Sequence, residues 1–280
     1  MSKRTRIATR VFILGMDGAG NWNEEASTPN MDRIIKQAGV MTQHAQTELP
    51  TISAQCWGSM LHGVTPDRHG VNNDIVAETP FPQNSPYPSF FRVAREADAT
   101  MKLASFTAWV PINFGLVEDG LDIYKASAND EELTRLAIQY LREVDDIDIF
   151  YFAIDLPDAA GHRYGYCTAE HVESIGAADE MFGQVLNAIE ARGWLEDSLI
   201  LFVTDHGGGG AVATGHGSDH PMDQTIFWGC AGPGVNRSAR LDGLTFKDTA
   251  AVVATALGLP IPAAWDARLP EDLFVREVIL

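Results

Sequence analysis

The chain has 280 residues, of which 45% are hydrophobic, and its formal net charge at pH 7 is −18. This length and composition allow a large buried core in one or at most two domains. The net charge and the lack of a lysine and arginine cluster that could release counterions argue against a nucleic-acid polymer as the main partner. No apolar stretch approaches the roughly 18 residues needed to span a bilayer, so we expect no membrane partner.

The first predicted element follows a short basic tail. Its apolar run VFILGM (11–16) is too short for the apolar region of a signal peptide and is followed by Asp17. We therefore interpret 10–16 as a first strand. The three cysteines lie far apart and form no CxxC motif, which argues against a disulfide framework. Together these observations favour a cytoplasmic location.

Apolar runs bounded by turn residues alternate with helical periodicity along the rest of the chain. In chain order we predict a helix at 28–39, a strand at 42–49, a helix at 54–63, a strand at 101–109, a helix at 129–144, a strand at 146–155, a helix at 169–193, strands at 198–204 and 224–235, and a helix at 247–258. Continuously apolar strands alternating with helices predict an α/β fold, with a mostly parallel central sheet and helices on both faces.

We find no internal repeat and no linker, so residues 1–280 are predicted to form a single domain. The stretch 72–100 is rich in Pro, Ser and Asn and is predicted to be a long surface loop. The wider region 72–128 is expected to lie on the substrate side. Its aromatic residues could stack on a leaving group, although packing in the core is the favoured interpretation.

Polar residues follow several predicted strands, and sites in open α/β sheets form beyond the carboxyl ends of the strands. Asp17 follows the first strand, LPDAAGHRYG (156–165) follows strand 146–155, and Asp205-His206 follow strand 198–204 before a run of four glycines. Each of these could be a helix cap or a surface residue when taken alone. Their common position predicts that they converge.

The spacing of Asp158 and His162 places both side chains on one face if the segment is a helical turn, which suits two ligands of one metal ion. The glycine-rich stretch TGHGSDH (214–220) offers His216 or His220 as a further nitrogen ligand. Ser53 is predicted at the start of a helix, where backbone N–H groups and the helix dipole favour an anion. An ordinary N-cap serine is the alternative there.

Several of these motifs, taken in order, resemble one family. The order of Asp17, ISAQCWGSMLHGVTPDRHG (52–70), PDAAGH (157–162), TDHG (204–207) and GHG (215–217) resembles the alkaline phosphatase superfamily, in its branch of type I phosphodiesterases and nucleotide pyrophosphatases. The similarity extends over nearly the whole chain. It implies the alkaline phosphatase-like fold and a hydrolase that acts on small-molecule phosphoesters.

The resemblance also implies two zinc sites. Asp17, Asp205 and His206 would hold the ion that activates the nucleophile, and Asp158, His162 and His216 would hold the ion that activates water. With three protein ligands, each ion keeps a position open for substrate or water. Three aspartates against two dications leave the site net positive, which suits an anionic substrate.

Ser53 falls where the family places its nucleophile, ten residues before Gly63, and Thr51 is the neighbouring alternative. The Ser53 oxygen would also contact the first ion and would form a phosphoserine intermediate. Asn73 resembles the asparagine that donates a hydrogen bond to a phosphoryl oxygen, with Asn72 as the alternative.

Other functions are weighed against this one. A sulfatase needs a Pro and an Arg at fixed spacing after its nucleophile, which SAQCW lacks, and a phosphoglycerate mutase relative needs a large inserted domain. A phosphonate hydrolase, a phosphomonoesterase and a non-catalytic metal-binding module remain alternatives. We expect a preference for diesters, because no Arg or Lys between Ser53 and Arg68 could bind the dianion of a monoester.

Overall fold

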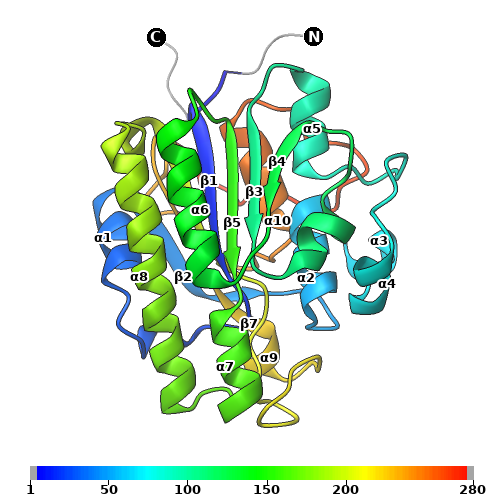
Figure 1. Ribbon diagram of the computed structural model, residues 1–280, viewed down its shortest axis with the longest axis vertical. Helices are drawn as coiled ribbons and strands as arrows, with labels where there is room; N and C mark the ends of the chain where they lie inside the picture. The colour runs from blue at the N-terminus through cyan, green and yellow to red at the C-terminus, as the bar shows by residue number, and fades with distance from the viewer. Residues whose placement is uncertain (1–4, 276–280) are drawn as a thin grey trace.

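A seven-stranded sheet lies at the centre of residues 5–275, which are the part of the chain that the computed structural model describes (Figure 1). Its strands are β1 (Arg10–Met16), β2 (Gly39–Gln46), β3 (Leu103–Thr107), β4 (Ile123–Ala126), β5 (Ile149–Ile154), β6 (Ser198–Thr204) and β7 (Thr225–Ala231), in the order β2-β7-β6-β1-β5-β3-β4. Only the pairs made by β7 are antiparallel among these strands. The predicted mostly parallel α/β fold is therefore confirmed.

Helices cover both faces of the sheet. On one face lie α1 (Pro29–Ala38), α6 (Asp130–Glu143) and α8 (Ala169–Ala191), and on the other lie α2 (Ser53–His62), α5 (Phe90–Ala97) and α10 (Asp248–Ala256). Figure 1 shows α6 and α8 in front of the sheet and α10 behind it. Neighbouring residues of β1 enter different cores, since Ile13 packs with the α2 side and Leu14 with the α8 side.

The chain ends and short elements complete the architecture. The short elements are η1 (Trp22–Glu24), α3 (Pro66–His69), α4 (Asn73–Glu78), η2 (Ile112–Leu116), α7 (Leu156–Tyr164), η3 (Leu195–Asp197) and α9 (Pro221–Gln224). Residues 1–4 of the predicted tail, and the final residues of the predicted 1–280 domain, lie outside the described residues. Within residues 5–275 no helix has both the length and the apolar character needed to cross a membrane.

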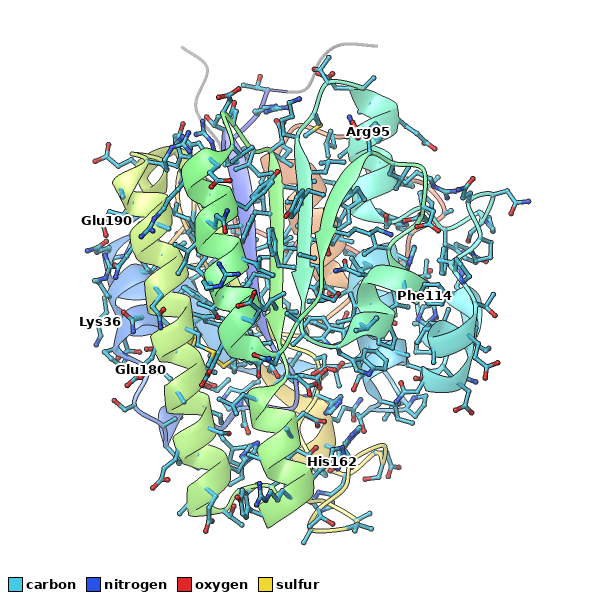
Figure 2. The ribbon with its side chains drawn as sticks, viewed as in Figure 1. Lys36, Arg95, Phe114, His162, Glu180 and Glu190 are labelled. Carbon is cyan, nitrogen blue, oxygen red and sulfur yellow. The ribbon has the colours of Figure 1, made fainter. Side chains whose placement is uncertain are left out.

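Part of the negative charge is carried by the solvated surface of α8. Figure 2 shows Glu180 and Glu190 on the outer side of α8, pointing away from the sheet, and both side chains are exposed. These two residues place part of the negative charge on the solvated surface, separate from the acidic residues that gather at the strand ends.

The prediction of a long loop at 72–100 is wrong. This stretch contains α4 and α5 with irregular structure only over 79–89 between them, and two of the polar residues that pointed to a loop are helix caps. The Asn72 side chain accepts a hydrogen bond from the backbone N–H of Ile75, and the Ser89 side chain accepts one from Arg92. The aromatic residues Phe90 and Phe91 are fully buried, so they pack in the core.

Four strands bring the predicted site residues to one edge of the sheet. β1, β5 and β6 are parallel, and β2 also runs in their direction because two antiparallel pairings separate it from β6. Their carboxyl ends therefore meet at the edge where α7 and α9 lie, at the bottom of Figure 1. β7 begins at this edge, so the loop before it arrives there too.

One glycine in β1 allows a tryptophan to reach this edge. A Cβ atom at Gly15 would lie 2.7 Å from Cη2 of Trp57. The Trp57 indole Nε1 donates a hydrogen bond of 2.9 Å to Oδ2 of Asp17. Gly15 thus leaves the space in which Trp57 supports the first aspartate of the site.

We predict that Gly15→Ala lowers the free energy of unfolding by about 1–3 kcal/mol, the usual cost of an overpacked core. The cost should shrink in a Trp57→Phe background, because the ring atoms that the new methyl group would meet are then absent. Urea unfolding of the four proteins measures both values. An equal cost in the two backgrounds would show that the Trp57 ring is not what the methyl group meets.

Candidate functional site

Side chains from five segments converge at the carboxyl edge of the sheet. They are Asp17 after β1, Ser53 at the first position of α2, Asp158 and His162 on α7, Asp205 and His206 after β6, and His216 in the loop before α9. The segment 156–164 is helical, which meets the condition set in the sequence analysis and places Asp158 and His162 one turn apart on the same face.

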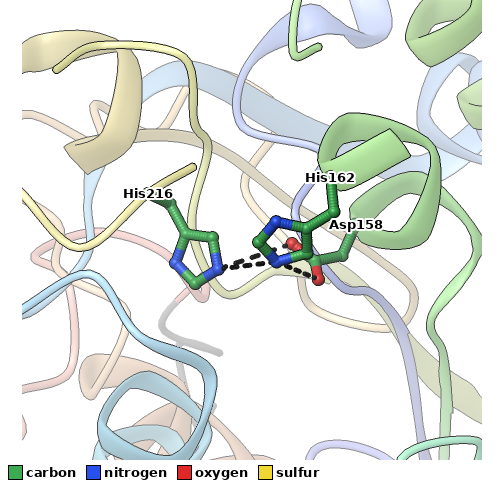
Figure 3. A group of neighbouring side chains, drawn as sticks. All are labelled: Asp158, His162 and His216. Carbon is green, nitrogen blue, oxygen red and sulfur yellow. Dashed lines mark hydrogen bonds and ion pairs between the residues drawn. The ribbon is translucent and has the colours of Figure 1, made fainter. Parts of the chain in front are cut away.

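The α7 pair and His216 form one compact group (Figure 3). Nε2 of His162 lies 3.2 Å from Oδ2 of Asp158, and Nε2 of His216 lies 3.8 Å from Oδ1 of the same carboxylate. The two imidazole Nε2 atoms are 3.3 Å apart. Ligand atoms of all three residues lie within 4.8 Å of one another, close enough to bind one metal ion.

Asp158 also belongs to a second group, with Asp17 and His206, whose ligand atoms again lie within 4.8 Å of one another. The sequence placed Asp205 with these two residues. Oδ1 of Asp205 accepts hydrogen bonds from the backbone N–H groups of Gly18 and His206, at 3.0 and 2.9 Å. Its Oδ2 is buried, has no hydrogen-bond partner among the described residues and lies 3.3 Å from Nε2 of His206. This Oδ2 atom is therefore available to bind a metal ion.

All three histidines are held through the same ring nitrogen. Nδ1 of His162, His206 and His216 lies 2.9, 2.9 and 2.7 Å from the backbone oxygens of Thr214, Gly207 and Thr51, respectively. A carbonyl oxygen only accepts, so Nδ1 carries the proton and Nε2 presents its lone pair in the neutral ring. Three Nε2 atoms therefore face the carboxylates, as metal-binding histidines commonly do.

Ser53 lies against the second group. Its Oγ is 3.2 Å from Nε2 of His206 and 3.5 Å from Oδ1 of Asp17, and the residue is 7% exposed. The neighbouring backbone N–H of Ala54 donates to Oδ1 of Asn73, at 3.0 Å. Asn73 is thus tied to the start of α2, with its amide Nδ2 free of this contact.

The residues that the sequence offered as alternative site residues make contacts outside the ligand groups. The Thr51 hydroxyl accepts a hydrogen bond from the backbone N–H of Gly217 and donates one to the Ser218 carbonyl oxygen, so it anchors the loop that carries His216. Asn72 caps α4. The exposed His220 caps α9, with its Nδ1 accepting a hydrogen bond from Met222, and it belongs to neither ligand group.

Burial and mutual repulsion shape the charges of the site. Burial, followed by the charges of Asp205 and Asp158, raises the pKa of Asp17 well above its usual value. Burial likewise raises the pKa of Asp205 to about 8 and that of Asp155 to about 7. A divalent cation would offset both the cost of burying these charges and the repulsion between them. The hydrogen bond with Asp158 raises the pKa of His162 to about 9, so metal binding would have to release a proton.

Three residues near the site were missed in the sequence. Asp155 directly follows β5, at the N-cap position of α7, beside the other carboxylates. The buried Asp223 accepts hydrogen bonds from the backbone N–H groups of Gly210 and Ser218, and so joins the glycine loop to the His216 loop. The Tyr166 hydroxyl donates to Oδ1 of Asp158. Asp155 could have been found from its position at the end of a predicted strand, whereas no sequence motif marks Asp223 or Tyr166.

Comparison with known proteins shows which family the chain resembles. The sequence model of the family described as type I phosphodiesterase / nucleotide pyrophosphatase matches residues 11–217. Human ectonucleotide pyrophosphatase/phosphodiesterase family member 7 is 24% identical over 223 residues, covering 71% of this chain and 47% of the relative. GPI ethanolamine phosphate transferase 1 of Candida glabrata is 27% identical over 126 residues, covering 45% of this chain and 13% of the relative. The chain spans about half the length of the first of these relatives.

Solved structures share the fold. Murine ectonucleotide pyrophosphatase/phosphodiesterase 5 superposes with a TM-score of 0.77 at 13% identity, over 95% of this chain and 100% of that one. A 2-O GAG sulfatase superposes with a TM-score of 0.71 at 13% identity, over 94% of this chain and 73% of that one. The match of the family model over most of the sequence confirms the resemblance seen in the motifs: the chain belongs to the type I phosphodiesterase / nucleotide pyrophosphatase family.

Proposed function

We propose that the chain is a phosphoester hydrolase in which Ser53 is the nucleophile and two divalent metal ions, zinc in the first instance, are bound. The observation that best supports this proposal is the position of the Ser53 Oγ. It lies at the start of α2 and within 3.5 Å of two candidate metal ligands, Asp17 and His206. The activity fits the family to which the chain belongs.

The donor set fits zinc. Imidazole nitrogen and carboxylate oxygen are ligands that zinc takes in low number. One ion would be held by Asp17, Asp205 and His206 with the Ser53 oxygen, and the other by the remaining three ligands, Asp158, His162 and His216. Bound there, the ions would lower the pKa of the serine hydroxyl and of water and would stabilise negative charge on the reacting oxygens.

The chain's own groups then carry out the displacement. The Ser53 hydroxyl gives up its proton to solvent, and its Oγ forms a bond to phosphorus while the bond to the leaving oxygen breaks. The leaving oxygen takes up a proton from solvent, and the product on the chain is a phosphoserine. Water cleaves that ester, which releases phosphate or a phosphomonoester and returns the Ser53 hydroxyl. Because Oδ1 of Asn73 already accepts the Ala54 N–H, its Nδ2–H groups are left to donate to a phosphoryl oxygen.

The charge around the site favours diesters or anhydrides over monoesters. Among the described residues, no arginine or lysine has a hydrogen bond or ion pair with any of the eight proposed site residues. Arg68 is paired with Asp266, and the Arg163 guanidinium lies over the ring of Tyr164, 4.9 Å from its centroid. An inactive variant of murine ectonucleotide pyrophosphatase/phosphodiesterase 5 has been solved in complex with AMP. This supports a small nucleotide-like ester as the first substrate to test.

Ser53→Ala should lower kcat by about 10³-fold or more, a loss expected when a nucleophilic serine is removed. Bound metal should remain, since six carboxylate and imidazole ligands are kept. Ser59→Ala is the matched control, because this buried serine on the same helix contacts His69 instead of the site. Activity that survives Ser53→Ala but is lost in Thr51→Ala would identify Thr51 as the nucleophile.

His216→Ala should weaken binding of one metal ion by about 10-fold or more, because removal of even an indirect partner of a metal has effects of that size. His220→Ala should leave both ions bound, since its ring only caps α9. Metal analysis after equilibrium dialysis measures both variants. The reverse pattern would assign the ligand to His220, and wild-type protein that carries one ion or none while active would refute the two-ion site.

A hydrolysis panel of nitrophenyl diester, monoester and phosphonate ester tests the reaction itself. We predict that kcat/KM is highest for the diester and that a chelator abolishes all turnover. A monoester advantage of about 100-fold, equal to about 2.7 kcal/mol of transition-state binding, would reverse the assignment and require an added cationic contact. Highest turnover of the phosphonate ester would select that alternative, and metal binding without any turnover would indicate a binding module.

A further inference from the structure

Tyr166 lies directly behind the candidate metal ligands. It follows α7 after Gly165, and only 5% of its surface is exposed. Its ring approaches the imidazoles of His162 and His216 edge-on, with centroid distances of 5.9 and 6.1 Å and interplanar angles of 78° and 76°. Its backbone N–H donates to the Ala213 carbonyl oxygen at 2.9 Å, which links it to the loop of His216.

Glycines on two segments make the space for this ring. A Cβ atom at Gly161 of α7 would lie 2.5 Å from Cε1 of Tyr166, and one at Gly208 after β6 would lie 2.6 Å from Cδ1. Real Cβ atoms do not approach other atoms this closely. The ring is therefore enclosed between α7 and the glycine run, and its hydroxyl has a fixed direction.

That hydroxyl donates a hydrogen bond to Oδ1 of Asp158. Asp158 is the residue that the two candidate metal groups of the described chain share. The terminal torsion of an aspartate side chain is broad, so a carboxylate that lies between two candidate ligand groups needs a partner to set its orientation. Hydrogen bonds to ligating carboxylates commonly have this function.

We propose that Tyr166 is a positioning residue that orients the Asp158 carboxylate toward the metal ion that Asp158 would bind together with His162 and His216. The proposal rests on the metal sites of the proposed function. It adds that the phenol, enclosed by Gly161 and Gly208, sets metal affinity without touching substrate or ion.

Tyr166→Phe tests this, because the change keeps the ring and its packing and removes only the hydroxyl. Zinc affinity is measured by competition with a chromogenic chelator, in the absence of any phosphoester, and the thermal midpoint is measured for the metal-free proteins. We expect at least one ion to bind about 10-fold to 100-fold more weakly than in the wild type. Tyr140→Phe on α6 is the matched control, since Tyr140 packs among Phe106, Tyr124 and Phe150 and should leave zinc binding unchanged.

Each outcome bears on the proposal. Weaker zinc binding with an unchanged thermal midpoint of the metal-free protein supports it. Zinc affinities of Tyr166→Phe within twofold of wild type for both ions would overturn it and leave the proposed hydrolase intact. A lower midpoint with unchanged affinities would also overturn it, by assigning Tyr166 a purely structural role. Wild-type protein that binds no zinc would overturn the metal sites and this proposal together.

Discussion

The crowding of carboxylates at one edge of the sheet is the constraint on which the site depends. Because β1, β5 and β6 are parallel neighbours, the acids that follow them have to share one small buried volume. The protein supplies neutral donors to each: the Trp57 indole to Asp17, the Gly18 N–H to Asp205 and the Tyr166 hydroxyl to Asp158. Neutral donors do not cancel the charge, and the pKa values of Asp17 and Asp205 stay raised by burial. The remaining repulsion is what bound cations would relieve.

The same crowding explains the glycines that surround the site. Gly18 has a φ of +69°, and a Cβ atom there would lie 2.7 Å from the Asp158 side chain. A Cβ atom at Gly207 would lie 2.1 Å from the backbone oxygen of Met222, and one at Gly208 would meet the Tyr166 ring. The run of glycines after β6 is thus needed for close packing of backbone and ring behind the ligands. Open space for a substrate is not the reason for these two glycines.

Much of the fold could be predicted because its strands are continuously apolar and its long helices have caps. The errors arose where a residue type has two uses: Asn72 and Ser89 are as common in loops as at helix N-termini, where they lie here. For the site, most of the polar residues could be identified because they follow the ends of predicted strands. The choice between His216 and His220 could not be made, because it depends on the path of a loop in space. No sequence pattern indicated a role for Tyr166 in the site, because an aromatic residue next to a glycine usually only packs in the core.

Fold similarity alone does not separate the possible reactions. A phosphodiesterase relative and a sulfatase superpose on this chain with TM-scores of 0.77 and 0.71, so both chemistries are compatible with the sheet and its carboxyl edge. The atoms that could bind a metal ion are what distinguish the possible reactions. Hard cations such as calcium and magnesium prefer oxygen ligands, whereas imidazole nitrogen suits zinc. This site has three imidazoles whose Nδ1–H groups are all held by backbone carbonyls, so that every Nε2 faces inward. The Nε2 of His206 lies 3.2 Å from the Ser53 Oγ, and this arrangement supports the zinc-assisted attack by serine that we propose over the modified nucleophile of a sulfatase.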